Sequence, residues 1–156
     1  MFFKQYSDRA RMVVFAARYR SGKNGAAAVD TNHLIEAIIL EDQGKLEDAL
    51  ESGKLLYPTP EPHPPFFSTE AASEMLLKIE QVVPHNQPIP ESEDMPLSDD
   101  LVRTFEVAET LAQDLKHEQL EPLHLLAAAA SEHSVAAELL RAAGVTKDQV
   151  IGVLRT

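Results

Sequence analysis

The sequence of 156 residues contains no cysteine and no tryptophan, and aromatic residues make up only 6% of it. The lack of cysteine excludes disulfides, thiol nucleophiles and cysteine-type zinc sites, and so few aromatics provide few stacking platforms for bases or sugars. Basic residues are also scarce, because 14 Lys and Arg stand against 25 Asp and Glu, for a formal net charge of −11. A nucleic-acid backbone or an anionic lipid surface requires a basic face. We therefore expect neither nucleic acid nor membrane as a partner.

Long apolar runs are missing as well. None approaches the roughly 18 residues that cross a bilayer. The first ten residues, MFFKQYSDRA, lack the apolar core and the small-residue cleavage site of a signal peptide. A chain of this length can bury a core without disulfide or metal staples. The composition therefore predicts one soluble, acidic, cytoplasmic domain over residues 1–156.

Proline and acidic charge are distributed unevenly along the chain. Nine of the ten prolines lie between Pro58 and Pro96, and the tenth is Pro122. Residues 1–53 carry seven basic and eight acidic side chains, whereas residues 54–156 carry seven and seventeen. Because proline is excluded from helix interiors, we interpret 54–67 as a proline-rich insert and 84–96 as a linker. The acidic run around residues 91–100 is expected to be mainly a solvated linker and the first turn of a helix.

A single offset of 91 residues relates the two halves of the chain. It carries Ser7 onto Ser98 and His33 onto His124, and an apolar stripe at helical spacing follows each serine. One offset held across a helix, a loop and the start of a second helix indicates a duplication. We place repeat one at residues 1–83, including the insert, and repeat two at residues 97–156.

Capping residues and apolar spacing predict helices throughout and no strands. The expected helices cover residues 7–20, 31–41, 45–52, 68–83, 98–115, 122–132, 134–143 and 146–155. Gly22 and Gly53 are expected to end the first and third of them, and Thr146 with Gln149 is expected to form a capping box at the last. The predicted fold class is all-α, with two pseudo-symmetric four-helix repeats packed around one core.

The sequence offers little for catalysis or metal binding. The glycine-containing loop 21–25 lies between expected helices, and no Ser or Thr follows Lys23, so it is not a phosphate-binding P-loop. The histidines lack the spacing of metal ligands, and no nucleophile motif is present. We expect no enzyme activity, no cofactor and no metal. His33 and His124 begin equivalent apolar helices, and the favoured interpretation is that each bonds nearby backbone and fixes the preceding loop.

Partner binding is the function that the pattern favours. Two packed repeats create a groove at their junction, and helical grooves commonly take up short apolar segments. Exposed aromatic candidates are Phe2, Phe3 and Tyr6 at the start of the chain and residues 66–67 after the prolines. The competing interpretation is that these aromatics anchor the chain end and the insert onto the core. The candidate contacts are Phe2, Phe3, Tyr6, Asn32, His33, Leu123 and His124.

The duplicated segments resemble the double Clp repeat. Residues 6–17 (YSDRARMVVFAA) are similar to its first helix, and residues 136–145 (AAELLRAAGV) to its C-terminal part. The second helix of that repeat begins with a Gly-Thr-Glu-His-Leu-Leu motif, which reads DTNHLI at residues 30–35 and EPLHLL at residues 121–126. The resemblance extends over nearly the whole chain except the insert and the linker.

This resemblance implies an all-α, non-catalytic N-terminal domain of a Clp/Hsp100 AAA+ unfoldase. Such domains dock protein substrates or adaptor proteins for the Clp-type ATPase, which works with a protease or as a disaggregase. Some members bind phosphoarginine through a carboxylate just before each motif histidine. Asn32 and Leu123 occupy those positions here, so we expect weak or no phosphoarginine binding. The motif glycine is also replaced, by Asp30 and Glu121, so the loop geometry can differ.

The alternative is a stand-alone helical scaffold or regulatory interaction protein that is not attached to an ATPase. The acidic segment 91–100 would then serve as its docking strip.

Overall fold

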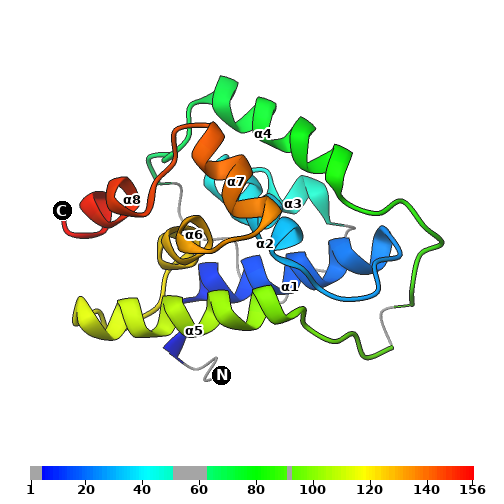
Figure 1. Ribbon diagram of the computed structural model, residues 1–156, viewed down its shortest axis with the longest axis horizontal. Helices are drawn as coiled ribbons and strands as arrows, with labels where there is room; N and C mark the ends of the chain where they lie inside the picture. Colours follow the sequence, from blue (N-terminus) through cyan, green and yellow to red (C-terminus); the bar gives the residue numbers. More distant parts are fainter. Residues whose placement is uncertain (1–4, 51–62, 91–92) are drawn as a thin grey trace.

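The computed structural model describes residues 5–50, 63–90 and 93–156, which form eight helices (Figure 1). Besides these helices, the described residues form two isolated β-bridges. The prediction of an all-α fold is confirmed. The helices are α1 (Asp8–Lys23), α2 (Thr31–Asp42), α3 (Leu46–Ala49), α4 (Thr69–Val82), α5 (Asp99–Asp114), α6 (Pro122–Ser131), α7 (Val135–Ala142) and α8 (Lys147–Leu154).

Side-chain caps explain where most of these helices begin. The hydroxyl at each of five N-caps accepts a hydrogen bond from the backbone N–H three residues later, which satisfies a group that the helix leaves unpaired. Asp30 caps α2 in a related way, by accepting from the N–H of Thr31 at 2.8 Å. The five hydroxyl caps are Ser7, Ser68, Ser98, Ser134 and Thr146.

Two of the expected helices end elsewhere in the structure. α1 continues through Gly22 to Lys23, and the left-handed residue that follows it is Gly25, with φ of +64°. The helix expected over 45–52 is the single turn α3, and Leu50 after it is extended. Gly53, which was expected to end that helix, and residues 54–62 of the insert lie outside the described residues.

The core is built around α2. This helix lies at the centre of the molecule, in contact with α1, α3, α4, α5, α6 and α7 (Figure 1). Its predicted apolar positions, which are Leu34, Ile35, Ile38 and Ile39, are all buried. In α6, the buried residues 127–130 are all alanine, and their small side chains let α5, α7 and α8 pack closely against that helix. None of the described helices is long and apolar enough to cross a membrane.

The duplication is visible in the backbone. An offset of 91 carries α1 onto α5 over its whole length, and it carries the first residue of α2 onto that of α6. The two β-bridges obey the same offset, because Tyr6 pairs with Leu120 and Leu97 pairs with Val29, both in parallel. Backbone hydrogen bonds of 2.8–3.0 Å form each bridge. Each bridge therefore joins a residue just before the first helix of one repeat to a residue just before the second helix of the other repeat.

The linker packs against the end of α1. The backbone N–H groups of Asn86 and Ile89 each donate at 2.9 Å to a carbonyl in the last turn or cap of that helix. The approach is so close that a Cβ on Gly25 would lie 2.3 Å from the carbonyl oxygen of Gln87. The equivalent position in repeat two is Lys116, which has the same left-handed backbone, with φ of +59°. The two repeats therefore differ at this position, where the linker approaches Gly25 closely and Lys116 carries a side chain.

Candidate functional site

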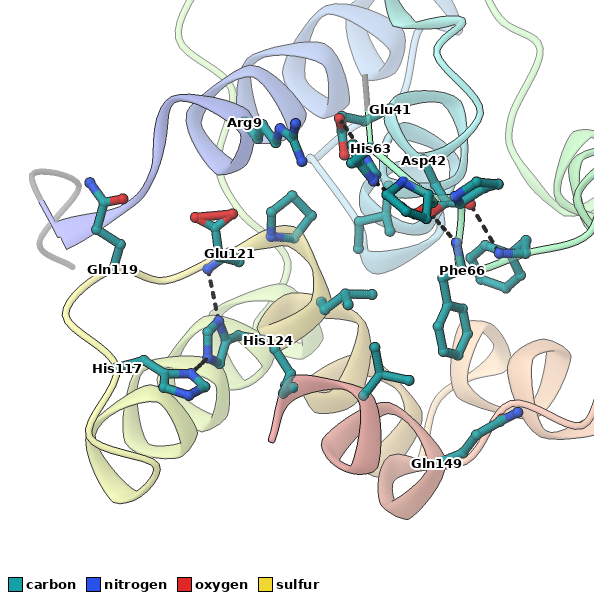
Figure 2. Close-up of a pocket in the computed structure, with 18 residues that line it drawn as sticks. Arg9, Glu41, Asp42, His63, Phe66, His117, Gln119, Glu121, His124 and Gln149 are labelled. Atoms are coloured by element: carbon teal, nitrogen blue, oxygen red, sulfur yellow. Dashed lines mark hydrogen bonds and ion pairs between the residues drawn. The ribbon is translucent and has the colours of Figure 1, made fainter. Parts of the chain in front are cut away.

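A groove of about 630 Å³ lies between the start of α6, the end of α2, the segment 63–67 and α8 (Figure 2). We call it the junction groove. This groove lies at the junction of the two repeats, where their packing predicted a groove. Its apolar lining includes Ile38, Pro65, Phe66, Leu123, Val153 and Leu154.

The segment 63–67 forms one wall of the junction groove, and Asp42 holds that wall in place. The buried Asp42 carboxylate accepts hydrogen bonds from the backbone N–H groups of Phe66 at 2.7 Å and Phe67 at 3.0 Å. Phe67 is buried, and its ring meets that of Phe66 edge to face with centroids 5.0 Å apart. The interpretation that these aromatics anchor the end of the insert is correct for Phe67, while Phe66 also faces the groove (Figure 2).

Charged side chains line the groove between the wall segment and the start of α6. Figure 2 shows Arg9, Glu41, His63 and Glu121 there, and Nε2 of His63 lies 3.1 Å from a carboxylate oxygen of Glu41. Partial burial raises the pKa of Glu121 above its usual value, and a hydrogen bond from Ser7 and the charge of Arg9 oppose that shift. The groove thus has an apolar wall next to a polar end that can accept and donate hydrogen bonds.

A pair of histidines lines the groove beside Glu121. Nδ1 of His124 accepts the backbone N–H of Glu121 at 2.8 Å, and its Nε2 lies 2.8 Å from Nδ1 of His117. A backbone N–H can only donate, so the neutral His124 ring carries its proton on Nε2 and donates it to His117. Burial, together with the neighbouring His117, lowers the pKa of His124 to about 4. The expected bond between this histidine and nearby backbone is confirmed, and the bond to His117 was not foreseen.

The equivalent histidine of repeat one has different surroundings. Nε2 of the buried His33 lies 3.0 Å from the side-chain amide nitrogen of Asn24. That bond is to a side chain, so the expected bond to backbone is wrong for His33. Its Nδ1 and the buried Oδ1 of Asn32 have no hydrogen-bond partner, and burial lowers the pKa of the ring. Neither residue lines the junction groove.

Tyr6 does not belong to an exposed aromatic edge. It is 1% exposed, and its ring packs near that of Phe105 with centroids 6.3 Å apart. The backbone bridge to Leu120 draws this residue into the core, and burial raises the pKa of its hydroxyl. The expectation that Tyr6 is an exposed contact is therefore wrong. Phe2 and Phe3, the other aromatic candidates at this end, lie outside the described residues.

Of the described candidates, the structure brings only Leu123 and His124 into the groove. Sequence reasoning missed the polar end of the groove and the Asp42 clamp. His117 could have been found from the sequence, because it lies seven residues before His124, in the loop that leads to the start of α6. Only tertiary packing brings Arg9, Glu41 and Val153 to the groove. No local sequence pattern predicts that these residues line it.

The lining of the groove is suited to noncovalent binding. No Ser, Thr, Cys or Lys is among its described residues. Across the described ranges, no three His, Asp or Glu side chains are placed to hold one metal ion. An apolar wall beside hydrogen-bonding groups matches the needs of a chain segment that has both side chains and a polar backbone.

Comparisons with known proteins show a match to one family over part of the chain and a likeness in fold to solved structures. Residues 96–155 match the family described as Clp repeat (R) N-terminal domain. A solved structure from investigations of a malarial protein secretion system has a TM-score of 0.71 at 16% identity, covering 97% of this chain and 92% of that one. The N-terminal domain of the caseinolytic protease associated chaperone ClpD from Arabidopsis thaliana has a TM-score of 0.60 at 18% identity, covering 97% and 93%. A search of curated proteins by sequence found no match.

Proposed function

We propose that this chain, which carries a Clp repeat within the fold of Clp N-terminal domains, is a non-catalytic docking module. Its junction groove binds short apolar segments of protein substrates or adaptor proteins. The bound protein is then presented to a Clp-type AAA+ ATPase, which is either continuous with this chain or a separate molecule. The proposed binding site is the groove as a whole and does not include the aromatic residues at the start of the chain.

The observation that carries this proposal is the exposed apolar lining of the groove. Val153 on α8 remains 43% exposed, and Phe66, Leu123 and Leu154 are partly buried around the same hollow. Full burial of one large apolar side chain contributes about 1.5–3 kcal/mol before the cost of association. Two such side chains in the groove support modest affinity, which suits a site that must release its occupant to an ATPase ring.

A matched pair of variants tests the role of the groove. Val153→Asp places a carboxylate in the groove, whereas Val82→Asp places one at the end of α4, where the valine is 42% exposed and outside the groove. Both positions lie in the last turn of a helix, so the substitutions have similar intrinsic costs. We expect Val153→Asp to weaken binding about tenfold, because it removes apolar contact and adds a charge that must be desolvated.

The measurement is fluorescence anisotropy with a labelled decapeptide of Leu, Phe and Ser. A second decapeptide, in which Ser replaces every Leu and Phe, serves as the ligand control. Melting temperatures verify that both variants fold. Equal affinities for Val153→Asp, Val82→Asp and the unmodified chain would remove the groove from the binding site, as would equal affinities for the two peptides.

The ATPase part of the proposal has its own measurement. A Clp-type ATPase ring, fused to this chain or mixed with it, should unfold a reporter protein that carries the apolar decapeptide faster than one that carries the serine version. Val153→Asp should remove that difference, while Val82→Asp should keep it. A ring whose unfolding rate does not respond to this chain would contradict the link to an ATPase.

A further inference from the structure

The His117–His124 pair in the junction groove has a fixed proton arrangement. The backbone N–H of Glu121 occupies Nδ1 of His124, so the single proton of that neutral ring lies on Nε2. That proton is donated to Nδ1 of His117 at 2.8 Å. His117 must therefore have an unprotonated Nδ1, and its own proton lies on Nε2. The two bonds, from Glu121 to His124 and from His124 to His117, can exist together only while both rings are neutral.

Addition of one proton to His117 breaks this arrangement. A doubly protonated imidazole has no acceptor left, so an N–H on Nδ1 of His117 would face the N–H on Nε2 of His124. His124 cannot invert its donor and acceptor roles, because its Nδ1 would then present a proton to the N–H of Glu121. The only accommodation is for the His117 ring to leave His124. Histidine side chains change charge between about pH 5 and pH 8.

We propose that the His117–His124 hydrogen bond is a proton-sensitive latch of the junction groove, which holds the groove in its docking form while His117 is neutral and releases it when His117 is protonated. The regulation rests on the proposed docking function. His117, Leu123 and His124 line the same groove, so release of the latch moves a ring out of the lining. It also leaves an imidazolium beside a surface that must be dehydrated to receive an apolar segment.

Several charged and titratable groups surround the latch. On other elements these are Arg9 of α1, Glu41 of α2, Glu121 of α6 and His63 of the wall segment, all of which line the groove. Asp114, Lys116 and Glu118 flank His117 on its own stretch of chain. His63 is the only histidine among these groups, and its contact with Glu41 is an ion pair only when its ring is protonated. His63 is therefore the rival explanation for any pH dependence of binding.

The first experiment measures the latch without a ligand. Nitrogen-15 spectra of the imidazole rings report which nitrogen carries a proton, and methyl spectra report the position of Leu123. At pH 7.5 we expect Nδ1 to be unprotonated in both His117 and His124. As His117 titrates, the Nε2 signal of His124 and the methyl signals of Leu123 should shift with the same midpoint. Titration of His117 with no response from His124 would overturn the latch.

The second experiment measures docking of the apolar decapeptide at pH 7.5 and pH 5.5. We expect affinity to fall about fivefold at the lower pH, a change equivalent to about one net hydrogen bond. His117→Asn keeps an acceptor close to the position of Nδ1 but cannot titrate, so its affinity should be the same at both values. The matched control His85→Asn replaces an exposed histidine outside the groove, and it should retain the fivefold change.

The outcomes separate the latch from the docking function. No binding of the apolar peptide at either pH would defeat the proposed function and the docking consequence of the latch, while the imidazole spectra would still decide whether the latch exists. Binding that is equal at the two pH values would overturn the regulation. Retention of the pH effect in His117→Asn, with its loss in His63→Asn, would assign that effect to His63 and also overturn the proposal.

Discussion

The contact between the linker and the end of α1 makes Gly25 the most demanding glycine among the described residues. Gly25 and Gly44 have nearly the same left-handed backbone, with φ of +64° and +69°. Alanine in this conformation costs about 1–2 kcal/mol, and this cost applies equally to both sites. Their surroundings differ, because nothing lies within 4 Å of a Cβ at Gly44, whereas a Cβ at Gly25 would meet the carbonyl oxygen of Gln87 at 2.3 Å. We therefore expect Gly25→Ala to be more destabilising than Gly44→Ala.

The size of the difference follows from what the linker must give up. The obstructing atoms are backbone atoms of Asn86 and Gln87 and the Cβ of Asn86, none of which can rotate away as the end of a side chain could. Displacement of this backbone breaks the hydrogen bonds donated by Asn86 and Ile89 to the end of α1. Each contributes about 1 kcal/mol net. We expect Gly44→Ala to cost about 1 kcal/mol and Gly25→Ala about 3 kcal/mol.

Urea unfolding followed by circular dichroism gives both free energies, and amide hydrogen exchange shows whether the linker is displaced. In Gly25→Ala the amides of Asn86 and Ile89 should exchange faster, while in Gly44→Ala they should keep their protection. Equal losses of unfolding free energy in the two variants would refute the reasoning. Unchanged protection of the two linker amides in Gly25→Ala would do the same.

Three further predictions concern His124, the Asp42 carboxylate and phosphoarginine. The pKa of His124 is about 4 in the folded chain, against about 6.5 in the unfolded chain. Between these pH values only the unfolded chain takes up a proton at His124, so the free energy of unfolding falls as the pH falls from about 6.5 to 4. The loss is about 3 kcal/mol, and His124→Asn should remove it in urea unfolding at pH 7.5 and pH 4.5. Asp42→Asn leaves the backbone N–H of either Phe66 or Phe67 without an acceptor, so at least one of these two amides should exchange at least about tenfold faster. Calorimetric titration with phosphoarginine should give no saturable binding below about 1 mM, because Asn32 and Leu123 supply no carboxylate.

Each of these predictions has a clear contrary result. Identical pH profiles of stability for the unmodified chain and for His124→Asn would show that this ring is not the titrating group. Unchanged exchange of both the Phe66 and the Phe67 amide would mean that Asp42 does not hold the wall. Tight binding of the free phospho-amino acid would show that another group supplies the partner for its guanidinium.

The helices were predictable because their signals are local. A serine or threonine before an apolar stripe marks five of the helix starts, and the offset of 91 needs nothing beyond the sequence. The end of α1 was predicted less well, because Gly22 was expected to stop the helix, whereas the left-handed glycine after it is Gly25. The choice between them depends on Gln87, which approaches only Gly25 closely enough to require the absence of a side chain.

The functional site was predictable only where it belongs to the repeat motif. Leu123 and His124 follow from their position at the start of an apolar helix. The misplacement of Tyr6 has a physical cause, since its burial depends on a backbone bridge to Leu120 in the other repeat. The Asp42 clamp likewise joins groups 24 and 25 residues apart. Neither contact has a periodic signature that the sequence alone could reveal.

The crossed bridges have a consequence for how the chain reaches its folded form. In each repeat, backbone groups that precede the helices are hydrogen-bonded to the other repeat. Neither half on its own can therefore satisfy these groups. These long-range closures must be completed before the core is complete, which slows folding relative to a simple helical bundle. The same four hydrogen bonds can also be made between halves that belong to different molecules. Refolding at high protein concentration should therefore yield exchanged dimers, in which the first repeat of one chain is completed by the second repeat of another.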